Sequence, residues 1–194
     1  MYFMHVCSGP SYPILADEII VDPKTAGSIS LIIQIALPCV LYLSKSLTLR
    51  IRGGTDVKFS PPVDYVSNVL LPALFGTKQD TIKLSIDRRG FYPAGGGMVV
   101  LRSSSLSRGV KAIRMYRRGR VKSARAFVVI WGPDGEMRKR FAESIKSTLN
   151  KLFSKCTNLA TLKDVQMSFG STRKTKKNRH TSFTINVVAY TETG

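Results

Sequence analysis

The sequence predicts an α+β fold organised in two parts. Segments in which apolar and polar residues alternate, the pattern of strands with one solvated face, are mixed with segments in which apolar residues recur every three to four positions, the pattern of helices. A polar, serine-rich stretch at 103–107 interrupts this order, and the composition changes after it. We therefore expect one domain at 1–103 and a second that begins at residue 104.

The first part is expected to contain two helices and three strands. The nearly all-round apolar segment 26–43 predicts a helix buried on most sides, with a kink or an end at Pro38. A second helix is expected to begin with Asp64 as its N-terminal cap and to be shortened by Pro72. Alternation predicts strands at 47–51, 82–86 and 98–101.

The second part is expected to contain four strands and one long helix. The segment 124–131 is apolar at nearly every position, so we expect a strand that is buried on both faces. The helix is expected at 136–153, after a turn in which Asp134 caps it. Its apolar stripe is expected to consist of Met137, Phe141, Ile145, Leu149 and Leu152. The other strands are expected at 110–116, 165–169 and 182–190.

The charge of the chain indicates a polyanionic partner. Lys and Arg number 30 against 12 acidic residues, which gives a formal net charge of +18, and the pI is about 10.2. Nucleic acid is the leading candidate, and a basic ribosomal or membrane-surface protein is the alternative. The basic residues do not gather on one amphipathic helix, so we rank a membrane surface well below RNA.

The cysteines and the longest apolar run exclude several other classes. Cys7, Cys39 and Cys156 are odd in number and widely spaced, and the chain has only two histidines, so we expect no disulfide partner and no metal site of the zinc type. The apolar run 29–43 is shorter than the roughly 20 residues that span a bilayer. Residues 1–12 carry no pattern of a secretory signal. We therefore expect no membrane partner.

Two glycine-rich turns and a proline pair lie close together in the first part. The turns are 52–56 and 89–97, and the segment 60–65 between them contains two consecutive prolines. Each glycine costs folding entropy and is kept where the backbone needs a positive φ or approaches something closely. The three glycines at 95–97 are followed by a strand and not by Lys-Ser or Lys-Thr, so they indicate a tight turn and not a phosphate loop.

Together with the segment 25–29, Gln34 and the segment 37–39, these motifs resemble the RNA 3'-terminal phosphate cyclase family, in its cyclase branch. The resemblance implies a large domain of repeated βαβαββ-type units with a small α/β insert domain. On that scheme 1–103 is an incomplete large domain, 104–185 is the insert, and 186–194 begins the return to the large domain.

The resemblance also implies an activity. Members of the family use ATP, with a divalent cation such as Mg, to convert an RNA 3'-phosphate to a 2',3'-cyclic phosphate through an adenylated histidine and an RNA-phosphate-adenylate. The family's glutamate- and glycine-rich N-terminal segment has no match at 1–13, and its nucleophilic histidine belongs to a region beyond residue 194. We therefore assign no catalytic residue, neither His5 nor His180, and expect that this chain does not adenylate itself.

Gln34 and Pro61 match family residues that contact the nucleotide. Without the resemblance, Gln34 would be interpreted as a polar group satisfied by local backbone, and Pro61 as part of a turn that initiates the next helix. Asp64 and Tyr65 are expected to be a helix cap and a packing aromatic. Asp56 is expected to orient a neighbouring turn or to touch substrate.

Six arginines are candidates for RNA contact, because guanidinium groups near free backbone amides bind phosphate. The alternative is that they are solvated residues beside strands. They are Arg52, Arg88, Arg89, Arg117, Arg118 and Arg120. The basic run 173–179 is expected to be a disordered, solvated loop first, and a nuclear import signal or an RNA-binding element second.

The partner implied by the resemblance is RNA with a 3'-phosphate end. The implied location is the nucleoplasm in a eukaryote and the cytoplasm otherwise. The alternative function is that of a noncatalytic, cyclase-like protein that binds RNA or acts in ribosome biogenesis. Gln34 and the proline pair favour the cyclase branch.

Overall fold

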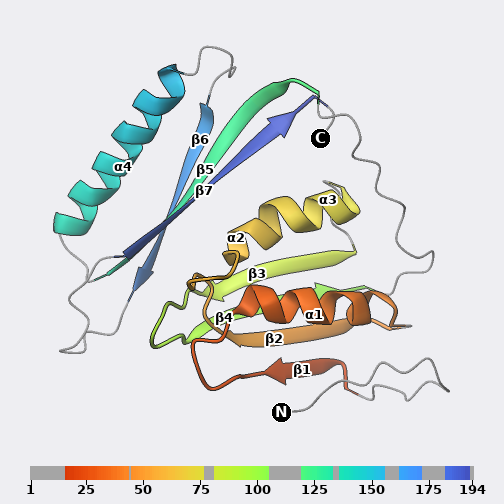
Figure 1. Cartoon of the computed structure of the whole chain (residues 1–194). Coiled ribbons are helices and arrows are strands. Elements are labelled where there is room, and N and C mark those ends of the chain that lie inside the picture. The colour runs from red at the N-terminus through yellow and green to blue at the C-terminus, as the bar shows by residue number, and fades with distance from the viewer. Residues whose placement is uncertain are drawn as a thin grey trace. The chain divides into compact units, whose positions relative to one another are not determined.

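The computed structural model describes residues 16–43, 45–76, 81–104, 119–132, 136–155, 162–171 and 182–192. The chain forms two compact units, Met1–Ala112 (unit 1) and Ile113–Gly194 (unit 2). In the described residues, unit 1 combines a small mixed sheet with two helical segments and unit 2 combines one with a single helix, so the predicted α+β class is confirmed (Figure 1). The domain limits inferred from the family resemblance stay a prediction.

Unit 1 contains a four-stranded sheet in the order β1-β2-β4-β3. Its strands are β1 (Glu18–Val21), β2 (Leu47–Gly53), β3 (Ile82–Arg88) and β4 (Gly97–Ser103). β1 runs parallel to β2, and the other pairs are antiparallel. In β2, Leu47, Leu49 and Ile51 are buried while the residues between them are more exposed, as the alternation predicts. All three strands predicted for this part are confirmed.

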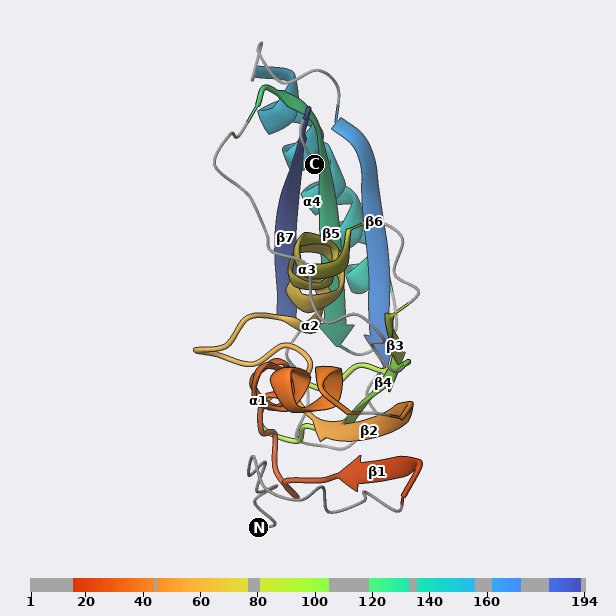
Figure 2. The ribbon, with the colours of Figure 1, turned by 90° about the vertical axis from the view of Figure 1, so that its right-hand side faces the viewer.

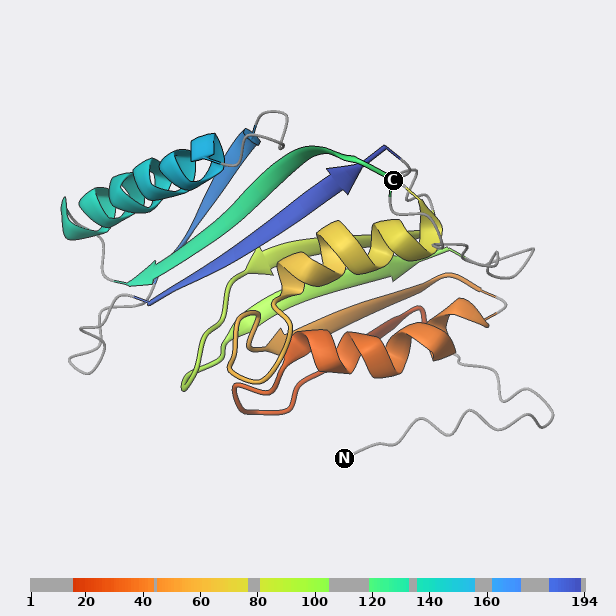
Figure 3. The same cartoon turned by 45° about the horizontal axis from the view of Figure 1, so that its top comes forward.

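Both helical segments of unit 1 pack on one face of this sheet (Figure 3). The first is α1 (Ile29–Leu41), which contains Pro38 and ends three residues after it. The second is a continuous segment of α2 (Val63–Tyr65), the π-helical turn η1 (Val66–Leu70) and α3 (Leu71–Phe75). Their apolar side chains and those of the strands form a single core.

One prediction about the second helical segment is wrong. Pro62, and not Asp64, is the residue before the helix, and Asp64 lies inside the first turn, where it binds Arg89. The helix continues past Pro72 to Phe75, and the shortening expected from Pro72 stays a prediction. A proline has no N–H and crowds the carbonyl one turn before it, and the wider π-helical turn that precedes α3 accommodates both effects.

Unit 2 contains a three-stranded sheet in the order β6-β5-β7, covered on one face by α4 (Figure 2). The elements are β5 (Val121–Gly132), α4 (Glu136–Lys155), β6 (Leu162–Ser171) and β7 (Ser182–Thr191). β5 is parallel to β6 and antiparallel to β7. Residues 126–131 are all buried, which confirms the central strand that the sequence predicts.

The contact stripe of α4 departs from the predicted one at its C-terminal end. Phe141, Ile145, Leu149 and Phe153 pack on the core of unit 2, whereas the side chain of Leu152 is 57% exposed. These four residues follow one another in steps of four, the spacing of neighbours along one face of a helix. Phe153 continues that row, and Leu152 lies at its margin.

Several predictions fall outside the described residues. They are the strand at 110–116, the cap at Asp134, Arg117 and Arg118, and the basic run 173–179. Among the helices of the described part, none has the length and apolar character that crossing a membrane requires.

Candidate functional site

Three loops meet at the end of the unit 1 sheet where β1, β2 and β3 end and α1 begins. We call the loops 22–28, 54–62 and 89–96 the turn cluster. The N–H of Gly54 donates to the carbonyl of Gly27 at 2.8 Å, which joins the first two loops. The N–H of Thr55 donates to the carbonyl of Gly90 at 2.8 Å, which joins the second loop to the third. Segments far apart in the sequence therefore form one tightly bonded surface.

The close packing of the turn cluster requires glycine at two positions in particular. Gly95 has a φ of +62°, and a Cβ there would lie 2.8 Å from the Cα of Ala26 in the neighbouring loop. A Cβ on Gly90 would lie 2.5 Å from the carbonyl oxygen of Gly53 and 2.6 Å from that of Gly95. In both cases the obstacle is backbone, which cannot rotate away as a side chain does. The glycine motif therefore forms a tight turn, as predicted.

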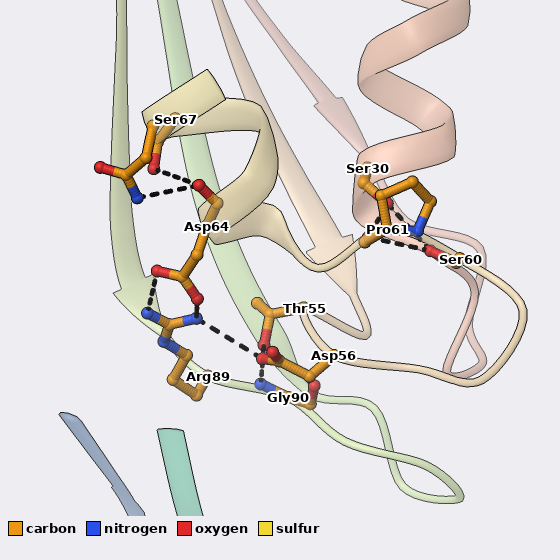
Figure 4. Close-up of polar contacts among 10 residues, drawn as sticks. Ser30, Thr55, Asp56, Ser60, Pro61, Asp64, Ser67, Arg89 and Gly90 are labelled. Carbon is orange, nitrogen blue, oxygen red and sulfur yellow. Dashed lines mark hydrogen bonds and ion pairs between the residues drawn. The ribbon is translucent and has the colours of Figure 1, made fainter. Parts of the chain in front are cut away.

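A buried ion pair lies at the base of segment 57–63, which runs from the second loop of the turn cluster to the first residue of α2 (Figure 4). The Nη1 and Nη2 atoms of Arg89 donate to the two carboxylate oxygens of Asp64 at 2.5 Å and 2.8 Å. Nη1 also lies 3.5 Å from Oδ2 of Asp56. The three side chains are only 13%, 8% and 1% exposed, respectively. We call this group the Arg89 clamp; it joins the two ends of the segment, because Asp56 precedes the segment and Asp64 follows its last residue.

Burial and charge act in opposite directions within the clamp. Burial raises the pKa of Asp56 above its ordinary value of 3.8, more than the hydrogen bond from Thr55 and the charge of Arg89 lower it. The Oδ1 atom of Asp56 is buried and has no hydrogen-bond partner within the described part of the chain. Burial also lowers the pKa of Arg89, but the hydrogen bonds and charge of Asp64 outweigh it and raise that pKa. Arg89 is therefore a fixed positive charge, and Asp56 is the strained member of the group.

Three serine hydroxyls connect segment 57–63 to the start of α1, and two of them, Ser30 and Ser60, are drawn in Figure 4. The Oγ atoms of Ser28, Ser30 and Ser60 lie within hydrogen-bond distance of one another. The hydroxyl of Ser30 donates to the carbonyl oxygen of Pro61 at 2.5 Å. Ser28 is also the N-terminal cap of α1, where its Oγ accepts the N–H of Leu31. Pro61 is thus held against the first turn of the helix.

Gln34 lies one helical turn beyond this contact. It follows Ser30 by four residues, so the two are neighbours on the helix surface, about 6 Å apart along its axis. Its side chain is exposed and makes no hydrogen bond to another described residue. Pro61 is half-buried, and Pro62 next to it starts the helical segment. Gln34 and Pro61 therefore lie near each other, as a shared site requires, and their contact with a nucleotide stays a prediction.

The predicted RNA-binding arginines fall into different settings. Arg52 is exposed and lies 3.3 Å from the carboxylate of Asp22. Arg88 is exposed and donates from Nε to the carbonyl of Gly96 at 2.5 Å. Arg120 is exposed in unit 2, just before β5. Arg89 instead directs its guanidinium to carboxylates, which leaves little of it available to a phosphate.

Sequence reasoning missed the ion pair between Arg89 and Asp64. Both residues were singled out, one as a phosphate ligand and one as a helix cap, and no spacing rule connects positions 25 residues apart. Asp56 does orient a neighbouring turn, since its carboxylate accepts a hydrogen bond from the hydroxyl of Thr55 at 2.7 Å. Tyr65, which was expected to be a packing aromatic, is 38% exposed. Across the described residues, no group of three or more His, Cys, Asp or Glu side chains is placed to hold a metal ion.

Comparisons with known proteins agree with the motifs. Residues 9–191 match the sequence model described as RNA 3'-terminal phosphate cyclase. The chain is 35% identical over 148 residues to a "Probable RNA 3'-terminal phosphate cyclase" of Dictyostelium discoideum, with 75% of this chain and 34% of that protein covered. It is 33% identical over 138 residues to an "RNA 3'-terminal phosphate cyclase" of Desulfurococcus amylolyticus, with 70% and 38% covered. It is 52% identical over 79 residues to the protein of that name from Metallosphaera sedula, with 41% and 23% covered. The chain thus spans between about a quarter and two fifths of the length of these relatives.

Proposed function

Because the chain belongs to the RNA 3'-terminal phosphate cyclase family, we propose that unit 1 forms one wall of an adenine-nucleotide site. In this proposal Gln34 and Pro61 contact the nucleotide, and the reaction is the ATP-dependent conversion of an RNA 3'-phosphate to a 2',3'-cyclic phosphate. The observation that carries the proposal is the bond from the Ser30 hydroxyl to the Pro61 carbonyl, which holds Pro61 one turn away from Gln34.

The two residues have complementary capabilities. The exposed amide of Gln34 can donate and accept at the same time, which suits the polar edge of a base or a ribose hydroxyl. Pro61 offers a rigid, flat ring next to it, on a loop that is fixed at both ends by the Arg89 clamp. Because Pro61 is held in place before binding, less entropy is lost there when a nucleotide binds.

The chemistry of the reaction defines what this wall has to do. Attachment of AMP to the terminal phosphate converts a poor leaving group into a good one, and the adjacent ribose 2'-hydroxyl then attacks the phosphorus and releases AMP. The attack is intramolecular, so alignment supplies much of the rate. In the proposal, Gln34 and Pro61 orient the adenosine, while exposed Arg52 and Arg88 attract the RNA phosphates.

The proposal extends to the architecture. The elements of unit 1 follow the order β1, α1, β2, the second helical segment, β3 and β4, which corresponds to one βαβαββ-type unit of the family's large domain. Unit 2 would then be the α/β insert, with Arg120 among the residues that give it affinity for RNA. A divalent cation such as Mg would accompany ATP, and the location would be the nucleus in a eukaryote or the cytoplasm otherwise.

The test measures the affinity of the full chain for ATP and for AMP by isothermal titration calorimetry. Gln34→Ala should weaken nucleotide binding by about 3- to 10-fold, the value of one or two hydrogen bonds. Gln166→Ala, which removes an exposed glutamine from β6, is the matched control and should have no effect. Equal affinity of the Gln34 variant and the wild type would overturn the nucleotide role of this wall.

A second measurement separates the two branches of the family. The chain is incubated with α-labelled ATP and 3'-phosphorylated RNA, alone and within a longer polypeptide of the family that supplies further segments. Transfer of label to protein or RNA supports the cyclase. Tight RNA binding without nucleotide binding or label in either form would instead identify a noncatalytic RNA-binding protein.

A further inference from the structure

Phe59 occupies an unusual position at the tip of segment 57–63. Its side chain is 102% exposed, the largest exposure among the large hydrophobic residues of the described part. Its φ is 61°, in the left-handed region that bulky residues rarely enter. The residue therefore combines an unfavourable backbone conformation with a ring that gains nothing from burial, a combination that surrounding structure has to impose.

The loop that carries Phe59 is held on both sides. At its base, the N–H of Val63 donates to the carbonyl of Thr55 at 3.0 Å, and the Arg89 clamp joins the flanking aspartates. Directly after Phe59, Ser60 and Pro61 are bonded to Ser30 at the start of α1 (Figure 4). The ring is therefore presented from a fixed loop, which lowers the entropy lost when a ligand stacks on it.

The surroundings of the ring favour a single-stranded nucleic acid. Within the described residues, no aromatic or cationic side chain stacks on the ring of Phe59, so both of its faces are open. Lys58 precedes it and is exposed. An open aromatic face beside a cation is the arrangement on which bases of single strands stack while their phosphates are neutralised. The net charge of +18 attracts such a strand to the protein.

We propose that Phe59 is a stacking platform for a base of the RNA strand. The inference deepens the proposed function, because it names a residue that grips the RNA beside the nucleotide wall of Gln34 and Pro61. It rests on the proposed function only in one respect, namely that the bound RNA ends in a 3'-phosphate. A mononucleotide such as ATP is usually held in a concave site that buries most of its surface. The fully exposed ring of Phe59 does not enclose a ligand in this way, so the base that stacks on it belongs to the strand and not to ATP.

The experiment measures binding of fluorescein-labelled RNA by anisotropy, with the full chain. One ligand is a short single-stranded RNA with a 3'-phosphate, and the other is the same strand without bases. Phe59→Ala should weaken binding of the RNA by about 5- to 150-fold, which is the effect of replacing by alanine an aromatic side chain on which one base stacks. Binding of the strand without bases should be unchanged, and Phe59→Trp should retain the affinity for RNA.

Two variants serve as controls. Tyr42→Ala removes another exposed aromatic, 78% exposed, at the opposite end of α1, about 20 Å from the turn cluster; it should leave RNA binding unchanged. Lys58→Ala should weaken binding of both strands. The affinity should also depend less steeply on salt concentration, by the amount that corresponds to the loss of about one phosphate contact. Thermal unfolding of Phe59→Ala should match the wild type, since the ring makes no buried contact.

The outcomes decide the inference. Wild-type RNA affinity of Phe59→Ala, or an equal loss for both strands, would overturn the platform. A loss of ATP affinity with unchanged RNA affinity would assign the ring to adenine and would also overturn it. Failure of all variants to bind ATP would remove the proposed nucleotide wall, while the Phe59 inference would still be decided by the two RNA strands.

Discussion

Two sets of ion pairs in unit 1 place the same residue types in opposite settings. In the Arg89 clamp the three side chains are at most 13% exposed, and Arg89 binds Asp64 through two parallel hydrogen bonds. At the edge strand β1, the carboxylates of Asp17, Glu18 and Asp22 bind Lys45, Arg50 and Arg52. The side chains of these three basic residues are 36%, 37% and 49% exposed, respectively. Buried charges must be paired to be tolerated, whereas the exposed pairs add little to stability.

The difference explains what each set does. The edge pairs place charges along a four-residue edge strand, a means of discouraging pairing with another sheet. The clamp fixes the two ends of the loop that carries Phe59 and Pro61, so a buried charge determines the geometry of the candidate site. Arg52 and Arg89 thus belong to different functional classes, although both flank a glycine turn in the sequence.

The largest effect is expected from Arg89→Met, which removes the charge and keeps much of the side-chain volume. Asp64 and Asp56 would remain buried without their cation, and breaking a buried pair in this way costs about 3–5 kcal/mol. Urea unfolding followed by circular dichroism measures the free energy of unfolding. The matched variant at the edge, Arg50→Met, should lose less than about 1 kcal/mol.

A second variant checks that this loss arises from the unpaired carboxylate. Arg89→Met combined with Asp64→Leu removes both charges, and it should be more stable than Arg89→Met alone, because no carboxylate of Asp64 remains buried without a partner. Equal losses for the Arg89 and Arg50 variants would show that the clamp and the edge do not differ in the way described.

The next largest effect is expected from Gly90→Ala in the turn cluster. The new Cβ would meet the carbonyl oxygens of Gly53 and Gly95 at 2.5 Å and 2.6 Å, and such overpacking costs about 1–3 kcal/mol, occasionally more. Gly96→Ala is the matched control, since its φ is +71° but, apart from its two chain neighbours, no residue of the described part lies within 4 Å of the Cβ that it would gain. It should lose only the backbone term of about 1 kcal/mol. A larger loss for Gly96→Ala would mean that backbone conformation, and not close packing, dictates the motif.

How far the sequence predicts this structure depends on whether the deciding interactions are local. The strand β2 and the helix α4 follow from periodicity, because the spacing of their apolar residues shows which face is buried. Asp64 could not be assigned in this way, since an aspartate after two prolines fits a helix cap as well as a long-range ion pair. Its partner lies 25 residues away, and only the packing of the turn cluster brings the two together.

The candidate site shows the same division. The resemblance of the motifs to the cyclase family singles out Gln34 and Pro61, but the serine contact that holds them at one place joins residues 31 positions apart. Phe59 carried no signal in the sequence beyond an aromatic residue before Ser-Pro-Pro, because exposure and a positive φ are properties of the folded loop.

The pH dependence of stability that arises from Asp56 provides a smaller effect with which to compare the Arg89 clamp and the edge pairs. Burial raises the pKa of Asp56 in the folded chain. The folded state then binds the proton more tightly than the unfolded state, so the contribution of Asp56 to stability is greatest below its unfolded pKa and is lost as pH rises through the folded pKa. Asp56→Asn removes this dependence. The stability of the variant relative to the wild type should therefore increase as pH rises from the unfolded value of 3.8 through the folded pKa, as measured by urea unfolding at each pH.

The smallest effect is expected at the edge and has the opposite sign. The pKa of Asp22 is lowered, first by the hydrogen bond from the backbone N–H of Lys24 and further by the side chains of Lys24 and Arg52. Its contribution to stability is present above its unfolded pKa and is lost as pH falls through the folded pKa. Asp22→Asn should therefore lose stability relative to the wild type as pH rises through the folded pKa to above the unfolded value of 3.8, and added salt should reduce the difference because the paired side chains of Lys24 and Arg52 are exposed to solvent. If the Asp22 and Asp56 variants shifted in the same direction with pH, burial would not be what separates the clamp from the edge.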